Sequence, residues 1–205
     1  MPRLWDKGLP LDERILRFTA GEDHLLDERL VAYDVRASVA HARMLAAQGL
    51  LAADDCNAIC AGLEALGAAH AGGEWSIELA DEDAHGALER RLIQRIGAAG
   101  GRVHLGRSRN DQVLVALRLY LRDAISDLAS GADAVVAALE RVAAEQGSIA
   151  LPGYTHMQPA MPSTVALWAR GFAAELKDDR AALERVRARA DQNPLGSATG
   201  KFGTP

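Results

Sequence analysis

Charged and amide side chains are concentrated between Val103 and Gln112, a segment that reads Val-His-Leu-Gly-Arg-Ser-Arg-Asn-Asp-Gln. The segment immediately precedes the longest helical pattern of the sequence, and Ser108, Asn110 or Asp111 could each cap that helix. Its arginines and histidine make it locally cationic in a chain whose net charge is −5. Binding of a small polycarboxylate requires such a site. The same string would also serve as an ordinary helix start with solvated arginines.

A second polar segment, from Leu151 to Pro162, holds Thr155, His156 and Gln158 among three prolines and a glycine. Proline fixes its own φ and restricts the residue before it, so the sequence predicts a stiff loop. A stiff backbone suits a site because it holds side chains in place. The imidazole of His156 can exchange a proton near neutral pH, and the hydroxyl and amide beside it favour acid–base chemistry. A solvated loop histidine is the alternative.

A third candidate, His85, follows three acidic residues that open a predicted helix and complement its dipole, Asp81, Glu82 and Asp83. Glu82 and His85 have the Glu-x-x-His spacing of carboxylate-bridged iron sites. Such a site needs a second copy from another helix, and the sequence has none. We therefore predict no metal site and keep His85 as a candidate substrate contact.

The elements that must position these residues are helices, because apolar residues recur at helical spacing over most of the chain. The predicted helices run from Asp27 to Gly49, from Asp54 or Asp55 to Gly72, from Asp81 to Ile96, from the Val103–Gln112 segment to about Glu145, and from Pro162 to about Arg189. Asp27 and one of the two neighbouring aspartates, Asp54 or Asp55, are the predicted N-caps. The first ~25 residues show no sustained period and are predicted to form an extended arm or loop anchored by Trp5 and Phe18.

The longest predicted helix carries apolar residues at intervals of seven, which are Leu114, Leu121, Leu128, Val135 and Val142. A seven-residue repeat maintained over this length indicates a left-handed supercoiled bundle. A helix of roughly 35 residues would extend about 50 Å, which is too long for a compact monomer of this size. The sequence therefore predicts that other helices, including those of neighbouring copies, cover this stripe.

Composition favours an all-α protein, and the lack of a signal-peptide pattern or a membrane-length apolar run favours the cytoplasm. Hydrophobic residues make up 49% of the 205 residues but aromatic residues only 4%, a balance typical of closely packed helices. Lys and Arg number 23 against 28 Asp and Glu, and without a long basic face we expect no nucleic acid partner. We expect no signal peptide and no membrane span, because no apolar run reaches the ~20 residues that a span requires. Cys56 and Cys60 are predicted to be small buried hydrophobes.

Three motifs, in this order and separated by long helices, resemble the argininosuccinate lyases of the fumarase and aspartase superfamily. They are Gly106-Arg107-Ser108-Arg109-Asn110-Asp111-Gln112, Pro152-Gly153-Tyr154-Thr155-His156-Met157-Gln158 and Pro194-Leu195-Gly196-Ser197. Shorter segments at Leu4–Trp5, His41–Leu45 and Glu82–His85 also resemble the family. Thr-His-x-Gln is shared across the superfamily, whereas Arg-Ser-Arg-Asn-Asp-Gln is specific to argininosuccinate lyases and the lens delta-crystallins derived from them.

The resemblance implies a reversible elimination that splits argininosuccinate into arginine and fumarate, without a metal or an organic cofactor. It assigns acid–base work to His156, either as the proton carrier or as the group that orients one. Substrate binding would fall to Asn110, Thr155, Ser108, Arg109, His85 and Gln158. These residue types suit the reaction, because charge builds on a carboxylate as the neighbouring carbon loses its proton, and the departing guanidinium nitrogen needs one.

The resemblance also implies a division of the chain. Residues 1–106 would form an N-terminal arm and a small helical domain, and residues 107–205 the first part of the central bundle of long helices. The family's catalytic serine loop is absent, so we expect a truncated chain that is nearly inactive alone. The superfamily assembles its sites from three subunits of a homotetramer, which we also expect here. Gly21 replaces a substrate-contacting serine of the family's arm, which puts that contact in doubt. An adenylosuccinate-lyase-like enzyme and a crystallin-like structural protein are the alternatives.

Overall fold

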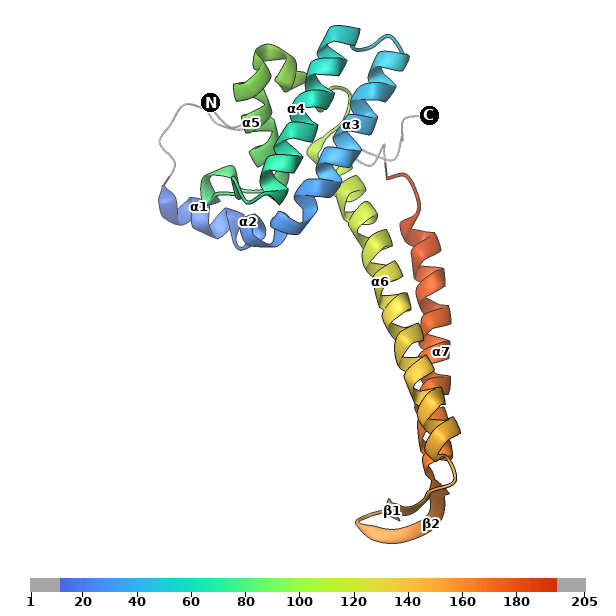
Figure 1. Ribbon diagram of the computed structural model, residues 1–205. Coiled ribbons are helices and arrows are strands. Elements are labelled where there is room, and N and C mark those ends of the chain that lie inside the picture. The colour runs from blue at the N-terminus through green and yellow to red at the C-terminus, as the bar shows by residue number, and fades with distance from the viewer. Residues whose placement is uncertain (1–11, 195–205) are drawn as a thin grey trace. The chain divides into compact units, whose positions relative to one another are not determined.

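The computed structural model describes residues 12–194, which form two compact units, residues 12–120 with 193–194 and residues 121–192. In chain order (Figure 1) the elements are α1 (Glu13–Ala20), α2 (Asp23–Leu26), the 3₁₀ helix η1 (Asp27–Leu30), α3 (Val31–Ala47), α4 (Ala53–Ala71), η2 (Leu79–Asp81), α5 (Ala84–Ile96), η3 (Gly97–Arg102), α6 (Arg109–Gln146), β1 (Ala150–Thr155), β2 (Gln158–Thr164) and α7 (Val165–Ala190). The predicted all-α class is confirmed, with one small sheet added. Trp5 and the Leu195–Ser197 part of the third motif lie outside the described residues.

In the second unit, the later part of α6 and α7 lie side by side and antiparallel (Figure 1). Ion pairs join the two helices in reversed order along the chain: Arg122 with Asp191 at 2.9 Å, Asp133 with Arg180 at 3.3 Å, and Glu140 with Lys177 at 2.8 Å. Exposed pairs of this kind each contribute little stability, so the packing beneath them must hold the helices together.

Small side chains are buried in the second unit, Ala143 on α6 and Ala169 and Ala173 on α7. A Cβ on Gly147 would lie 2.1 Å from the carbonyl oxygen of Ala143 and 2.9 Å from the Cβ of Ala166. Gly147 is therefore required at the point where α6 ends and the chain turns back.

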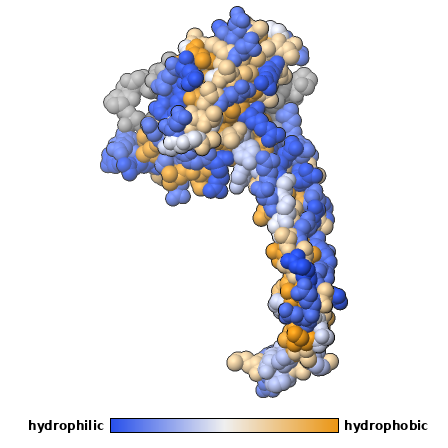
Figure 2. Space-filling view, in the orientation of Figure 1, coloured by the Kyte–Doolittle hydropathy of each residue, from blue (hydrophilic) through white to orange (hydrophobic). Residues whose placement is uncertain are grey.

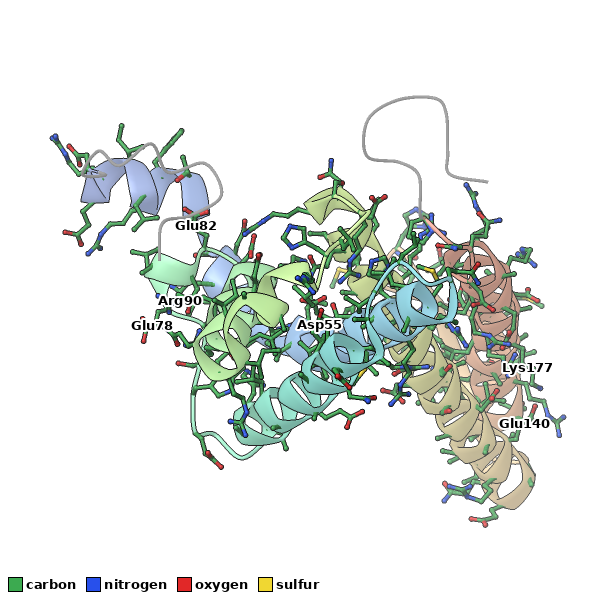
Figure 3. All side chains as sticks on the ribbon, turned by 90° about the horizontal axis from the view of Figure 1, so that it is seen from above. Asp55, Glu78, Glu82, Arg90, Glu140 and Lys177 are labelled. Carbon is green, nitrogen blue, oxygen red and sulfur yellow. The ribbon has the colours of Figure 1, made fainter. Side chains whose placement is uncertain are left out.

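The middle of the seven-residue apolar stripe of α6 is exposed in the single chain. Leu121, Leu128 and Val135 are 37%, 62% and 49% exposed, whereas Ile125 and Ala129 are buried. Figure 2 shows hydrophobic surface along these helices in orange, and the paired side chains of Glu140 and Lys177 are labelled in Figure 3. α7 thus covers one face of α6 and leaves another apolar face open to solvent in the single chain.

The segment predicted to be a stiff loop is instead a β-hairpin. β1 and β2 pair antiparallel, with Thr155 opposite Gln158 at the turn and an irregularity between Pro152 and Tyr154. The prolines made a loop the expected structure, but a two-stranded sheet has only edge strands, where a residue without an N–H is tolerated. Gly153 lies at the irregularity, where the Cβ of any other residue would meet the opposite strand.

The first unit begins with two short helices where an extended arm or loop was predicted. The carboxylate of Asp12 caps α1 by accepting a hydrogen bond from the N–H of Arg14 at 2.8 Å. Gly21 ends α1 with a φ of 50°. The prediction was wrong because so short a helix shows no sustained apolar period, while the glycines and the proline near it are typical of loops. Phe18 is 88% exposed and does not anchor this segment.

Two predicted N-caps have other roles. α3 begins at Val31, after η1, and Asp27 instead accepts a hydrogen bond from the N–H of Ala84 at 3.1 Å. Asp54 and Asp55 lie in the first turn of α4 rather than before it, where their charges complement the helix dipole. The other helices lie close to where they were predicted, and α6 ends at Gln146. α5 begins at Ala84 and not at Asp81: Asp81 ends η2, Glu82 follows it, and Asp83 is the N-cap of α5, so none of the three acids lies in its first turn.

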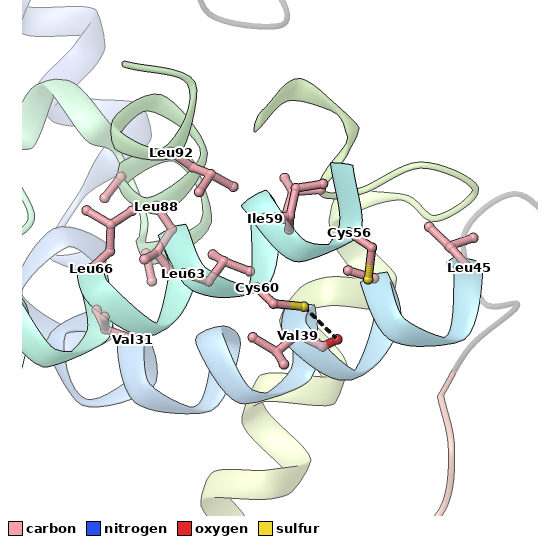
Figure 4. Close-up of a cluster of buried hydrophobic side chains, with 14 of the residues drawn as sticks. Val31, Val39, Leu45, Cys56, Ile59, Cys60, Leu63, Leu66, Leu88 and Leu92 are labelled. Atoms are coloured by element: carbon pink, nitrogen blue, oxygen red, sulfur yellow. Dashed lines mark hydrogen bonds between the residues drawn. The ribbon is translucent and has the colours of Figure 1, made fainter. Parts of the chain in front are cut away.

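α3, α4 and α5 share the hydrophobic core of the first unit (Figure 4). The largest fully buried apolar side chains there are Val31, Ile59, Leu63, Leu88 and Leu92. Burial of each contributes roughly 1.5–3 kcal/mol. Cys56 and Cys60 are buried in the same core as free thiols, as predicted. This core fixes how α3 and α5 lie against each other, and so positions the polar residues between them.

Among residues 12–194, no helix has both the length and the apolar character needed to cross a membrane. The domain boundary predicted after residue 106 stays a prediction.

Candidate functional site

Asp34, on α3, is the centre of a buried hydrogen-bond network in the first unit. Its Oδ2 lies 2.7 Å from Nδ1 of His85, and its Oδ1 accepts from the Ser38 hydroxyl at 3.1 Å. The side-chain amide of Gln112 donates to both oxygens, at 3.0 and 3.1 Å. Arg107 extends the network by donating to the Ser38 oxygen at 2.7 Å. These bonds tie α3 to α5 and to the first turn of α6.

Burial and charge act in opposite directions on the Asp34–His85 pair. Burial alone would raise the pKa of Asp34, but the charge and hydrogen bond of His85, helped by Gln112, lower that pKa below its usual value. Burial alone would lower the pKa of His85, but the Asp34 carboxylate raises it above the ordinary histidine value. The pair therefore favours a carboxylate beside an imidazolium.

Three polar atoms of this region are buried without a hydrogen-bond partner among residues 12–194: Nε2 of His85, Nε of Arg107 and Oγ of Ser108. His85 is only 2% exposed. Because an unpartnered buried polar atom is destabilising, these atoms indicate a place where a ligand or another chain would supply the missing bond. The partner of Nδ1 is Asp34, not Glu82 of the Glu-x-x-His pattern.

Arg109 joins the first motif to the acidic segment before α5. Its Nη1 lies 2.8 Å from Oδ2 of Asp83, which also caps α5 by accepting from the N–H of Gly86 at 2.6 Å. A Cβ on Gly86 would lie 2.5 Å from the carbonyl oxygen of Asp81, so this close approach requires glycine. Asn110 follows in the first turn of α6 and is exposed.

In the second unit, the hairpin turn holds two consecutive residues in the left-handed region. His156 has φ 49° and Met157 has φ 61°, and each costs about 1 kcal/mol or more for a residue with a Cβ. Oγ1 of Thr155 lies 2.9 Å from Nδ1 of His156. Thr155, His156 and Gln158 are all exposed in the single chain. Strain of this kind is often retained at functional sites.

The predicted site residues thus fall into two groups. His85, Ser108, Arg109 and Asn110 belong to the first unit, and Thr155, His156 and Gln158 belong to the second. In the first group, His85 belongs to the buried network of Asp34, whereas the second group lies on an exposed turn.

The sequence reasoning missed Asp34, Ser38, Arg107 and Gln112 as parts of the network. One signal could have identified the first two: Asp34 and Ser38 are four residues apart, hence on one helix face, between the buried Val31 and Ala42. A carboxylate and a hydroxyl on an apolar face need buried partners. Gln112 is separated from Asp34 by 78 positions, and no local pattern links them.

The chain belongs to the lyase family, whose family profile matches residues 12–205. Within that family, it is similar to argininosuccinate lyases: it is 48% identical to that of Sorangium cellulosum over 98% of this chain and 46% of the relative. With the argininosuccinate lyase of Thermotoga neapolitana it shares 37% identity over 99% of this chain and 51% of the relative. The chain thus spans about half the length of the curated relatives that it matches.

Solved structures show the same fold. A variant of EDDS lyase with bound fumarate matches 91% of this chain and 35% of its own, with a TM-score of 0.67 and 25% identity. A structure described as fumarate lyase:delta crystallin, from Brucella melitensis, matches 89% of this chain and 48% of its own, with a TM-score of 0.71 and 21% identity. The helical architecture is therefore that of the fumarase and aspartase superfamily.

Proposed function

We propose that the whole protein catalyses the reversible elimination of argininosuccinate to arginine and fumarate. The observation that carries this proposal is the 48% identity with an argininosuccinate lyase over 98% of this chain. The family-specific Arg-Ser-Arg-Asn-Asp-Gln string supports the same substrate. It favours an argininosuccinate lyase over the adenylosuccinate-lyase-like alternative.

His156 is the proposed acid–base residue. The reaction removes a proton from the carbon next to a carboxylate and delivers one to the departing guanidinium nitrogen, which an imidazole can assist near neutral pH. Thr155, bonded to Nδ1 at 2.9 Å, would orient the ring. Gln158, opposite Thr155 at the turn, would contact the substrate beside it.

The first-unit group would bind the dicarboxylate part of the substrate. The unpartnered Nε2 of His85 and Oγ of Ser108 supply donors, and Asn110 supplies an exposed amide. Arg109 already pairs with Asp83, so its proposed contact with substrate would use guanidinium N–H groups other than the one on Asp83. No step of this proposal requires a metal or an organic cofactor.

We also propose a cytoplasmic homotetramer in which neighbouring copies complete each site. The exposed apolar stripe of α6 supports association, because such a surface is unfavourable in water. Burial of the two exposed segments, the hairpin turn and the start of α6, against other copies would exclude water from the chemistry.

The direct test is fumarate release from argininosuccinate by the whole protein, with adenylosuccinate as the competing substrate. We expect turnover of argininosuccinate only, and His156→Asn should reduce kcat about 10²–10⁴-fold. His70→Asn is the control, because His70 has Glu28 and Trp75 as its partners and is not one of the proposed site residues. Turnover of adenylosuccinate alone, or of neither substrate, would reject the proposed reaction.

A further inference from the structure

We propose that Asp34 and Gln112 are positioning residues for His85: they hold its imidazole with Nδ1 donating to the carboxylate, so that Nε2 faces the substrate. This inference rests on the proposed function, because it assigns the missing partner of Nε2 to a carboxylate of the substrate. Asp34 and Gln112 would not touch the substrate themselves.

The hydrogen bonds allow the Asp34 carboxylate one orientation. Oδ1 accepts from Ser38 and Gln112, while Oδ2 bonds His85 and Gln112. An ionised carboxylate can only accept hydrogen bonds, so Nδ1 of His85 must carry a proton in this pair. Whether the second nitrogen, Nε2, donates or accepts a hydrogen bond then depends on the groups around it.

Nε2 distinguishes this network from one that only ties helices together. It is buried and has no hydrogen-bond partner in the part of the chain that the structure describes. If His85 had only a structural role, we would expect both of its ring nitrogens to be hydrogen-bonded, because an unpartnered buried polar atom lowers stability. A bound group that accepts a hydrogen bond at Nε2 resolves this.

The charges around His85 keep its imidazole protonated. Three carboxylates face it: Asp34 from α3, Asp27 from η1 and Asp83 at the start of α5, while Arg107 offsets part of the Asp34 charge. Burial lowers the pKa of His85, and these carboxylates more than compensate for it. In the resulting imidazolium Nε2 is also a donor, which suits a carboxylate of the substrate.

Asp34→Asn in the whole protein tests the inference, since asparagine keeps the size and one acceptor oxygen but removes the charge. Without that charge His85 should lose its proton at lower pH. We expect kcat/KM to fall less than about threefold at pH 6 but about 10–100-fold at pH 8. The loss should appear mainly in KM, because a carboxylate contact is present before and during the reaction.

Two further variants keep the test decisive. Ser38→Ala removes one donor to Asp34 and the acceptor of Arg107, so it should lower Tm and move the pH profile less than a variant that removes two donors. Gln112→Met keeps the volume but removes both donors to Asp34, which leaves the carboxylate more basic. His85 should then keep its proton to higher pH, so the profile should move by a smaller amount and in the direction opposite to that of Asp34→Asn. Gln112→Met also provides the result if Asp34→Asn does not fold.

A double variant and a binding experiment can each contradict the positioning role of Asp34. In a His85→Asn background, Asp34→Asn should cause no further pH-dependent loss. If Asp34→Asn lowered kcat/KM by the same factor at every pH, Asp34 would have only a structural role. The inference would also be overturned if Asp34→Asn lowered kcat/KM as much in the His85→Asn background as in the unsubstituted protein. Calorimetric binding of fumarate at pH 6 and pH 8 tests the positioning role independently of the proposed reaction. If Asp34→Asn weakened fumarate binding more at pH 8 than at pH 6, the positioning role would be supported even if argininosuccinate were not turned over.

Discussion

At the scale of single residues, a carboxylate buried on an apolar helix face is stable only when donors surround it. Asp34 has donors from α3, α5 and the start of α6. Removing one partner from such a buried pair typically costs about 3–5 kcal/mol, because it leaves an uncompensated charge. The same bonds that stabilise the first unit therefore also fix the position of a candidate site residue.

Gly86 provides a prediction at the residue scale. A Cβ there would lie 2.5 Å from the Asp81 carbonyl oxygen and 3.2 Å from Oδ1 of Asp83. Because a backbone oxygen cannot move aside without disturbing the start of α5, we expect Gly86→Ala to lower the free energy of unfolding by about 1–3 kcal/mol. Chemical denaturation of the chain measures this difference.

The control is Gly171→Ala, in α7, where a Cβ would meet nothing within 4 Å. Alanine has the higher helix propensity, so this substitution should raise the free energy of unfolding by about 0.5–1 kcal/mol. Similar effects of the two substitutions would contradict the close approach at Gly86.

The candidate residues could be selected from the sequence, but their partners could not. Residue type and local spacing indicated His85, Ser108 and Arg109. The bond from His85 to Asp34 joins residues 51 positions apart, and that from Arg109 to Asp83 joins residues 26 apart. Such pairs depend on how the helices pack, which apolar periodicity constrains only loosely.

At the scale of elements, the helices were predictable because each long one buries a stripe at helical spacing. The hairpin was not, because Pro152, Pro159 and Pro162 mask the strand pattern, and a hairpin of two edge strands accommodates them. α1 and α2 were missed for a different reason, which is that 8 and 4 residues are too few for a periodic signal.

The hairpin turn yields a prediction at the element scale. Met157 has a φ of 61° and a side chain that is 96% exposed, so glycine would relieve backbone strain and lose no packing within the chain. We expect Met157→Gly to stabilise the hairpin by about 0.5–1 kcal/mol. Amide hydrogen exchange in β1 and β2 reports the change as slower exchange.

Met161→Gly is the matched control, since Met161 is also exposed but lies within the extended strand β2. Glycine there adds freedom to the unfolded chain without relieving strain, so exchange in the hairpin should become faster. If Met157→Gly accelerated exchange as much as Met161→Gly, the left-handed turn would not exist in solution.

At the scale of the whole molecule, the exposed apolar residues of α6 and α7 call for further contacts. Leu121, Leu128 and Val135 form one stripe, and on α7 the rings of Trp168 and Phe172 pack edge to face at 5.5 Å while remaining about half exposed. The seven-residue repeat indicated a bundle from sequence alone. Which helices complete it could not be predicted, because the repeat specifies that a stripe is buried and not the partner that buries it.

Phe172→Glu tests whether this surface joins copies of the protein. Burial of a phenylalanine in an interface contributes roughly 1.5–3 kcal/mol, so its replacement by a charge should raise the dissociation constant of the assembly about ten- to a hundredfold. Sedimentation of the whole protein over a range of concentrations measures this dissociation constant.

Ala174→Glu, the control, adds the same charge at an exposed position two residues further along α7, which lies on a different helix face. We expect Ala174→Glu to leave the assembly intact. If Phe172→Glu sedimented like the unsubstituted protein, this face of α7 would have no part in association.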